Sequence, residues 1–498
     1  MQRKMPNVAR CFGRSAFVAL ALGAALGLSG CSDDPSAACT ATKGTLCDGS
    51  VLLTCVDGAT SNRDCGKENL GCTFVNGSTG STCVADPCAV VGPLGVCNNG
   101  GVTTCSNGIV THKECALSEA CAFVDGNTGY QCVANTDTVS ISGEISYDDK
   151  PPLNNGDLGP IQKLPARGIT VALIDDASKQ TLATVLTSDA GVYVIRIAPT
   201  TAMVHVTAIA QSKTLRRPIT VALPNNTVHG FASPSFAGTS DIQADLNVSE
   251  ASGAAQAFNI FDQSVHTMDT IVSDLGHATP TPLRAVWSRG NTNGTFYTGN
   301  TIFMLGETAD DDGYDDTVIL HETGHYVEDN EGRSDSPGGA HDGNLADPRL
   351  AWSEGFATYW ACAVQNQPIY SDSNAGGGFF DNIDTDVSRA SASGGLTQQV
   401  TESMVSQILW DLGDTTSKNG ADDDQLADGD HARVTKIQAS YLASASLRNV
   451  GTQGVDVVDF LDGWFVKQGL ASCSAVRDIV TGKRLFPYDY AGPGGACP

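Results

Sequence analysis

Two histidines and a glutamate stand close together in His321-Glu322-Thr323-Gly324-His325, within an apolar run over residues 318–327. The run predicts a buried helix, and residues four apart on a helix lie on one face. His321 and His325 can therefore reach the same metal ion. Glu322 would stand beside that ion, where it could take a proton from a bound water. This is the H-E-x-x-H pattern, in which two histidines bind zinc and the glutamate is a general base.

A third ligand is needed, because catalytic zinc usually has three protein ligands and one open position. Residues 351–361 predict a second buried helix, and Glu354 is the one formally charged residue in it. A carboxylate in so apolar a segment is costly unless something pairs with it, and a metal ion would do so. A helix cap or a buried salt bridge is the alternative role for Glu354. The sequence thus predicts His321, His325 and Glu354 as metal ligands.

The two motifs together resemble the gluzincin metallopeptidases, whose second helix carries a glutamate ligand in an N-E-G-F-A-like string. Here the string is Ser353-Glu354-Gly355-Phe356-Ala357, with serine in place of asparagine, and the motifs lie further apart than in the best-known members. The resemblance covers about residues 250–498. It implies an α+β, zincin-like and mostly helical catalytic domain that cleaves a peptide or protein substrate. The G-x-M-E-N string of the aminopeptidase branch is absent, which favours an endopeptidase.

The resemblance also implies a mechanism. Zinc would lower the pKa of its bound water, and Glu322 would act as the general base. A further donor should stabilise the oxyanion, and gluzincins use a later histidine or tyrosine for this. His431 is the only histidine after Glu354, so it is predicted to be catalytic, with Tyr359 as the second choice. The alternative for both His431 and His341 is an ordinary loop or surface histidine.

Residues 1–30 predict an export signal, because a basic start precedes an apolar stretch that ends in Leu28-Ser29-Gly30-Cys31. That ending resembles the bacterial lipobox, in which the cysteine becomes the lipid-anchored first residue. Ser32, rather than an aspartate, follows it and favours the outer membrane. The chain is therefore predicted to contact a membrane through a lipid on Cys31, before a linker at 31–38. An ordinary secretory signal or an uncleaved helix is the alternative.

A duplicated cysteine pattern follows, and it predicts two disulfide-rich repeats at 39–84 and 85–135. Six cysteines recur after 49 or 50 residues, at 39, 47, 55, 65, 72 and 83 and again at 88, 97, 105, 115, 121 and 132. Such small units need bridges for stability, and export leads to an oxidising compartment. The even, duplicated set predicts pairing within each repeat, with the connectivity open. The repeats resemble cysteine-rich repeats of secreted bacterial surface proteins.

Residues 136–245 lack cysteine and predict a small β-sandwich, with alternating strands at 139–147, 169–174, 181–187, 192–198 and 203–210. The turn at 187–193 resembles carboxypeptidase-regulatory-like modules. Residues 246–498 are predicted as the metallopeptidase domain. Its further elements are a helix from 257, strands at 285–287 and 301–305, and helices at 400–412, 431–446 and 455–468. Cys362 is predicted to be a buried thiol, and Cys473 to pair with Cys497. Residues 32–245 acting as a removable prosegment is an alternative.

The charge is strongly acidic. The net charge is −26, and it becomes −30 once residues 1–30 are removed; 44 of the 55 acidic residues are aspartates. Such a surface argues against nucleic acid as a partner. Aspartates cluster at 310–316 and 422–430, and calcium favours such oxygen-rich loops. Neither cluster has EF-hand spacing, so solvated acidic loops are the favoured interpretation and Ca²⁺ stays open as a second ion.

The sequence therefore predicts a multidomain chain of disulfide-rich repeats, a small β-sandwich and a zincin-like domain. Its predicted function is that of an exported or surface-anchored zinc metalloendopeptidase. An inactive surface-anchored binding or adhesion protein with a peptidase-like domain is the alternative. The presence of Glu322 favours the enzyme, because a structural zinc site needs no general base.

Overall fold

The computed structural model describes residues 43–134 in pieces, mainly strands, and residues 138–486 except 154, 340–344, 385–399, 415–425 and 427–428. The predicted signal segment, the anchor at Cys31, His341, Cys497 and most of the acidic run 422–430 lie outside the described residues. The chain divides into two compact units, one of residues 1–121 with 126–135 and one of residues 122–125 with 136–498.

The first unit contains the two cysteine repeats, and their strands recur as the cysteines do. The first repeat has β1 (Lys43–Asp48), β2 (Val51–Val56), β3 (Ala59–Asp64), β4 (Gly71–Asn76) and β5 (Gly80–Val84). The second has β6 (Val96–Asn98), β7 (Gly101–Ser106), β8 (Ile109–Glu114), β9 (Glu119–Asp125) and β10 (Gly129–Ala134). The antiparallel set β1-β2-β3 corresponds to β6-β7-β8. The disulfides Cys97–Cys121 and Cys115–Cys132 both lie within the second repeat, as predicted.

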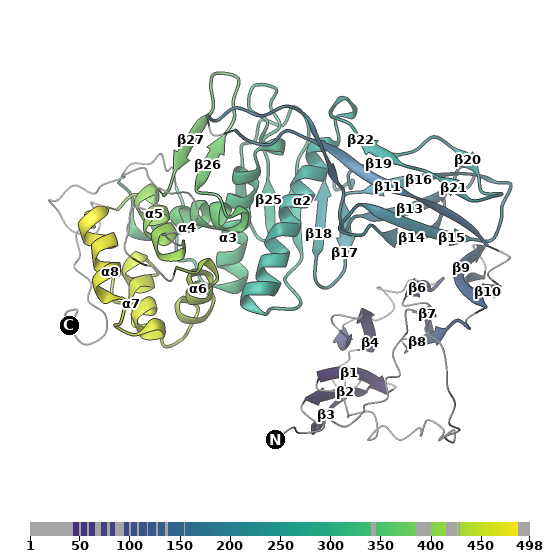
Figure 1. Ribbon diagram of the computed structural model, residues 1–498, viewed down its shortest axis with the longest axis horizontal. Helices are drawn as coiled ribbons and strands as arrows, with labels where there is room; N and C mark the ends of the chain where they lie inside the picture. The colour runs from purple at the N-terminus through teal and green to yellow at the C-terminus, as the bar shows by residue number, and fades with distance from the viewer. Residues whose placement is uncertain are drawn as a thin grey trace, which may run out of the picture. The chain divides into compact units, whose positions relative to one another are not determined.

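The second unit begins with two β-layers, of which the first is mixed and the second antiparallel (Figure 1). One layer is built on β11 (Val139–Asp149), which pairs with β12 (Gln162–Pro165) and β15 (Val192–Ile197), and in parallel with β21 (Ile242–Gln243) and β22 (Leu246–Val248). The other has the order β14 (Thr181–Leu186), β13 (Thr170–Asp175), β16 (Met203–Ile209), with β19 (Gly230–Ala232) and β20 (Phe236–Ala237) also paired to β16. The five strands predicted between 139 and 210 are confirmed.

A third, mixed sheet lies beside the helices. Its order is β17 (Gln211–Lys213), β18 (Pro218–Ala222), β23 (Leu283–Val286), β25 (Thr301–Phe303), β24 (Phe296–Thr298). The strands β18, β23 and β25 run parallel, and β24 closes the edge antiparallel to β25. Two of its strands, β17 and β18, come from the range predicted as a sandwich. The chain then returns to the first two layers through β19 to β22 before it enters the helices.

The helical part holds the centre of the molecule's apolar core. Its helices are α2 (Ala255–Thr270), α3 (Asp316–Glu331), α4 (Pro348–Gln365), α5 (Glu402–Gly413), α6 (His431–Ile437), α7 (Val457–Gln468) and α8 (Cys473–Arg477). Short helical segments are η4 (Glu250–Ser252), η5 (Ile271–Leu275), η6 (Asp312–Tyr314), η8 (Gln438–Leu442) and η9 (Asp478–Lys483). A hairpin of β26 (Ile369–Asp372) and β27 (Phe379–Asn382) follows α4. The predicted helices are confirmed, although the one expected at 431–446 is an α-helix continued by a π-helical turn.

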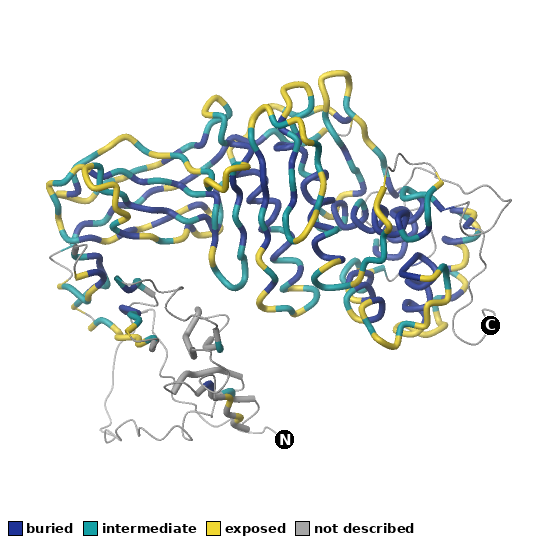
Figure 2. Tube along the Cα trace, turned by 180° about the vertical axis from the view of Figure 1, so that it is seen from behind, coloured by how far each residue is buried: buried dark blue, intermediate teal, exposed yellow. Residues whose placement is uncertain are grey.

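The β-layers and the helical part differ in how their residues are buried (Figure 2). In β15, Tyr193, Ile195 and Ile197 are buried whereas Val192 and Val194 are exposed, the alternation of a strand with one face in a core. By contrast α4 is buried on nearly every side, and its tryptophans Trp352 and Trp360 are fully enclosed. A helix that is apolar all round must lie inside the domain. Cys362, on the same helix, is a buried free thiol, as predicted.

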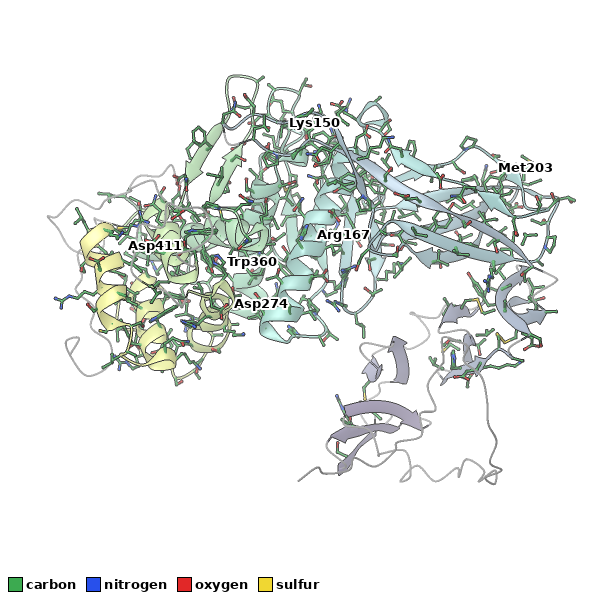
Figure 3. The ribbon with its side chains drawn as sticks, viewed as in Figure 1. Lys150, Arg167, Met203, Asp274, Trp360 and Asp411 are labelled. Carbon is green, nitrogen blue, oxygen red and sulfur yellow. A yellow bond between two sulfur atoms is a disulfide. The ribbon has the colours of Figure 1, made fainter. Side chains whose placement is uncertain are left out.

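The β-layers are joined to the helices by buried charge. Arg167, labelled in Figure 3, precedes β13. It pairs with Asp262 of α2, and its Nη2 lies 3.0 Å from Asp262 Oδ2. The hydroxyl of Tyr147, on β11, donates to the same Asp262 oxygen at 3.1 Å. A carboxylate that is 6% exposed needs such partners.

In the described part of the chain, no helix is both long and apolar enough to cross a bilayer.

Candidate metal centre

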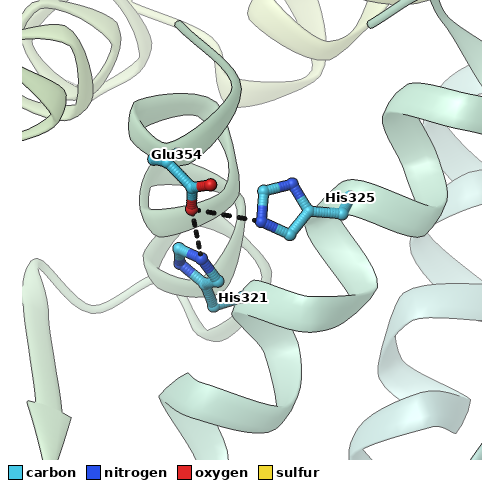
Figure 4. A group of neighbouring side chains, drawn as sticks. All are labelled: His321, His325 and Glu354. Carbon is cyan, nitrogen blue, oxygen red and sulfur yellow. Dashed lines mark hydrogen bonds and ion pairs between the residues drawn. The ribbon is translucent and has the colours of Figure 1, made fainter. Parts of the chain in front are cut away.

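The three predicted ligands converge on one point. The Nε2 atoms of His321 and His325 lie 3.1 and 3.2 Å from the same oxygen, Oε2 of Glu354 (Figure 4). Zinc bonds of about 2.0–2.1 Å in a tetrahedral arrangement place neighbouring ligand atoms about 3.3 Å apart. The two distances that meet at Glu354 therefore match the spacing around a zinc ion, and all three ligand atoms lie within 4.8 Å of one another.

Two helices set this spacing. His321 and His325 lie one turn apart on α3, so their rings leave the helix on the same face. The helix α4 begins with Pro348 at its first position, and the carboxylate of Asp347 caps it by accepting from the Arg349 amide at 3.0 Å. Glu354 follows in the second turn. The helices approach closely at Gly324, where a Cβ atom would lie 2.7 Å from Ala357 Cα. Glycine inside the first motif thus brings Glu354 within reach of both imidazoles.

The outward nitrogen of each imidazole has a partner. Nδ1 of His325 lies 3.3 Å from Glu328 Oε2 and 3.3 Å from the Ser353 hydroxyl. That hydroxyl in turn donates to Glu328 Oε2 at 2.5 Å. Nδ1 of His321 lies 3.1 Å from the Thr358 hydroxyl. In such networks the outward N–H donates to its partner, which leaves the Nε2 lone pair for a metal ion.

The charges fit a cation as well. Two Nε2 lone pairs that face a carboxylate oxygen repel it unless a cation or a shared proton lies between them. Burial lowers the pKa of His325, but hydrogen bonds to Glu328 and Glu354 outweigh it, so the pKa is raised well above the ordinary value. For Glu354 burial acts in the opposite direction and raises the pKa, yet the two imidazoles hold that pKa far below its usual range. The cluster therefore favours an ionised carboxylate and extra positive charge, which a divalent metal ion would supply.

A cavity of about 460 Å³ opens onto the cluster. Glu322 lines it together with all three ligands and the segment 295–299, which contains the edge strand β24. The acidic residues in its wall are Glu322, Glu328, Asp329 and Glu354, and no lysine or arginine is among the described residues that line it. Glu322 thus borders the space that a substrate at the metal would enter.

The predicted oxyanion donors are not in this cavity. His431 is the first residue of α6, where its ring packs at 4.7 Å against Trp410 and its Nδ1 lies 3.1 Å from the Tyr359 hydroxyl. Neither His431 nor Tyr359 is among the described residues lining the cavity. On α4, Tyr359 follows Thr358 and is fully buried, on a different face of the helix from Glu354. The structure therefore brings together His321, Glu322, His325 and Glu354, but not His431.

Three residues beside the site were missed by sequence reasoning. Glu328 and Thr358 stand one turn after His325 and Glu354, so helical spacing could have identified both. Tyr370 lies on β26, with its ring 5.9 Å from that of His321. Burial, Asp372 and Glu322 raise its pKa well above the ordinary value, which keeps its hydroxyl a proton donor. No local pattern in the sequence indicates Tyr370, because its position depends on the return of the chain after α4.

The model of one protein family, described as the mycolysin C-terminal domain, matches residues 272–461. This segment is less than half of the chain, and it contains His321, Glu322, His325 and Glu354. The match supports a metallopeptidase and suggests a secreted protein.

No curated protein matches the chain. Among solved structures, the major plantain pollen allergen Pla l 1 matches 22% of this chain and 91% of its own, at 14% identity and a TM-score of 0.14. So low a score carries no argument about fold or function.

Proposed function

We propose that this protein is a secreted zinc metalloendopeptidase. The observation that carries the proposal is the convergence of two imidazole nitrogens and one carboxylate oxygen beside Glu322, in a cavity bordered by an edge strand. A purely structural zinc site is closed and has four protein ligands, whereas three ligands leave a position open for chemistry.

Each residue has a distinct role in the proposal. His321, His325 and Glu354 would hold the ion, and Glu328, Ser353 and Thr358 would fix the two imidazoles. A zinc ion there would polarise a substrate carbonyl and lower the pKa of a water molecule to about 7. Glu322 would take the proton from that water and later give it to the departing amine.

The substrate would lie along β24. This strand is the edge of its sheet in the described structure, pairs with β25 on one side, and lines the cavity through Phe296, Tyr297 and Thr298. An extended peptide can add to such an edge through main-chain hydrogen bonds. Because main-chain pairing does not depend on a chain terminus, this geometry favours internal cleavage.

Tyr370 is our candidate for the oxyanion donor, in place of His431 and Tyr359, because its ring lies 5.9 Å from the ring of the proposed ligand His321. Like those two residues it is not among the described residues that line the cavity, so its hydroxyl would have to turn toward the metal. It lies against His321, and the charge of Glu322 acts on it. A neutral tyrosine hydroxyl that can turn toward the developing charge would stabilise it. Export and lipid anchoring at Cys31 complete the proposal, and the mass of the mature N-terminal peptide tests that part.

The experiment compares wild type with Glu322→Gln on the same zinc-analysed preparations. The amide has the shape of the carboxylate but cannot accept the proton. We expect equal zinc content and a loss of about 10²–10⁴-fold in the cleavage rate of an unfolded protein such as casein. The matched control is Asp329→Asn, an exposed acid in the wall of the same cavity.

Undiminished cleavage by Glu322→Gln would overturn the proposal. Zinc-loaded wild type that cleaves no member of a broad peptide library would instead favour a peptidase-like binding or adhesion protein.

A further inference from the structure

A second group of carboxylates lies outside the zinc centre. Asp310 and Asp312, in the loop before α3, and Asp372, at the end of β26, bring their ligand atoms within 4.8 Å of one another. The sequence favoured a solvated loop at 310–316. In the structure Asp312 is only 5% exposed, and Asp372 joins it from a distant part of the chain. Burying like charges together is costly, so the arrangement requires an explanation.

Asp315 supplies a second, independent observation. It is fully buried, and its Oδ2 accepts from the Ser373 hydroxyl at 2.9 Å. Its other oxygen, Oδ1, is buried without a hydrogen-bond partner among the described residues. The charges of Asp372 and Asp312 act on this carboxyl, so Asp315 lies near the group, although it does not belong to the three residues whose ligand atoms come within 4.8 Å of one another. Asp372 Oδ1 is likewise buried and without a described partner.

Two basic side chains, Lys150 and Arg289, border the same pocket as Asp310, and Lys150 pairs with Glu250 instead. Among the described residues, lysine, arginine and histidine form no ion pair with Asp310, Asp312, Asp315 or Asp372. Burial, with repulsion between the acids, raises the pKa of Asp372 to about 6, of Asp312 to about 7 and of Asp315 to about 8. No ion pair in the described structure supplies the positive charge that would keep the group ionised near neutral pH.

The neighbouring Asp311 differs from these acids in its hydrogen bonds. Its Oδ1 accepts from the Gly313 amide at 3.1 Å and from Trp287 Nε1 at 3.0 Å, and its Oδ2 accepts from Gln256 Nε2 at 3.1 Å. Both of its oxygens are therefore occupied by protein donors, and Asp311 holds the loop in place. Of the adjacent acids, Asp312 accepts from the Thr295 hydroxyl through Oδ2 alone, so the protein occupies fewer of the cluster's oxygens than it does at Asp311.

We propose that Asp310, Asp312 and Asp372 form a binding site for a calcium ion, with the buried carboxyl of Asp315 beside it. The donors are carboxylate oxygens without nitrogen or sulfur, the set that hard cations prefer, and calcium accepts the irregular geometry that magnesium does not. The site is separate from the zinc centre and its occupancy does not depend on the proposed peptidase activity.

The ion would fasten two segments that flank His321. The helix α3 starts at Asp316, directly after Asp315, and β26 carries Tyr370 against His321 two residues before Asp372. A calcium ion would therefore join the start of the helix carrying the H-E-x-x-H motif to the strand beside it. Loss of the ion should loosen this region and lower the temperature of unfolding.

The test uses the full mature chain, stripped of calcium with a calcium-selective chelator that leaves zinc in place. Calcium is titrated by calorimetry, and terbium by the emission that it gains from a nearby excited tryptophan, here Trp287 beside Asp311. We expect one saturable site per chain and a calcium-dependent rise in the unfolding temperature. Asp312→Asn and Asp372→Asn should each weaken binding at least about ten-fold, since each removes a charged ligand. Asp478→Asn, an exposed acid on η9, is the control and should bind as wild type does.

Wild type without saturable calcium uptake at millimolar concentration would overturn the proposal, and so would variants that bind with wild-type affinity. If both variants fail to fold, the wild-type titration and its unfolding temperature with and without chelator still decide the question.

Discussion

The proposed zinc centre and the aspartate cluster differ in how far the surrounding protein orients their side chains. In the zinc centre the outward nitrogens of His321 and His325 are held by Glu328, Ser353 and Thr358, so the ligands are oriented before an ion arrives. In the aspartate cluster, oxygens of Asp315 and Asp372 have no described partner. Zinc needs a fixed geometry, whereas calcium tolerates an adaptable set of oxygens. The difference indicates that the first site is built by the fold and the second would be completed by its ion.

One strand connects the two sites. On β26, Tyr370 lies against His321 and Asp372 belongs to the aspartate cluster. Variants near this strand can therefore show whether the two sites act independently, provided that zinc content, calcium affinity and cleavage rate are measured together.

Among the variants that compare the two sites, the largest effect is expected for Tyr370→Phe. It removes the hydroxyl that we place at the oxyanion but keeps the ring beside His321. We expect turnover to fall about 10²–10³-fold, while zinc content and calcium affinity stay unchanged. Steady-state kinetics on one peptide, with metal analysis of the same sample, measures this. Turnover close to wild type would assign the donor elsewhere.

A smaller effect should distinguish the partners of the two imidazoles. Glu328→Gln replaces a buried carboxylate next to His325, and we expect zinc affinity to fall about 10–100-fold. Thr358→Val removes a neutral hydroxyl next to His321 and should cost less, because a hydrogen bond to a charged group is the stronger one. Competition with a zinc chelator measures both variants. Equal losses, or a greater loss for Thr358→Val, would contradict the ranking, and Asp329→Asn serves as the neutral control.

The last variant, Gly324→Ala, is expected to have the smallest effect on catalysis. Its effect on the free energy of unfolding should still be measurable. The added methyl would meet Ala357 Cα at 2.7 Å and press α3 away from α4. Overpacking of this kind costs about 1–3 kcal/mol, measured by denaturant unfolding, and zinc affinity should fall with it while calcium affinity does not. Gly376→Ala is the control, because its nearest neighbour is the end of the Asn374 side chain. Unchanged stability would show that the helices can adjust at this contact.

Residues on regular helices were the predictable part of the site. His321, His325 and Glu354 come together because helical periodicity and the apolar flanks fix their faces, and both can be read locally. The same holds for the five predicted strands, β11, β13, β14, β15 and β16, but not for the short β12, which was not predicted from the sequence. Tyr370 and Asp372 were not predictable, because β26 reaches the site only through the tertiary path of the chain after α4. His431 was predicted only because it is the one histidine after Glu354. The type of a residue does not show where the fold places it.

The path of the chain through β17 and β18 has a consequence for how this protein can be divided. The chain leaves the first two β-layers to place these strands in the mixed sheet, and it returns through β19 to β22 before α2. A cut after residue 245 would separate β18 from β23, its parallel neighbour in the sheet that carries β24. The two parts are therefore interlaced, and neither a maturation protease nor an expression boundary at that point would leave intact the mixed sheet beside the candidate metal centre.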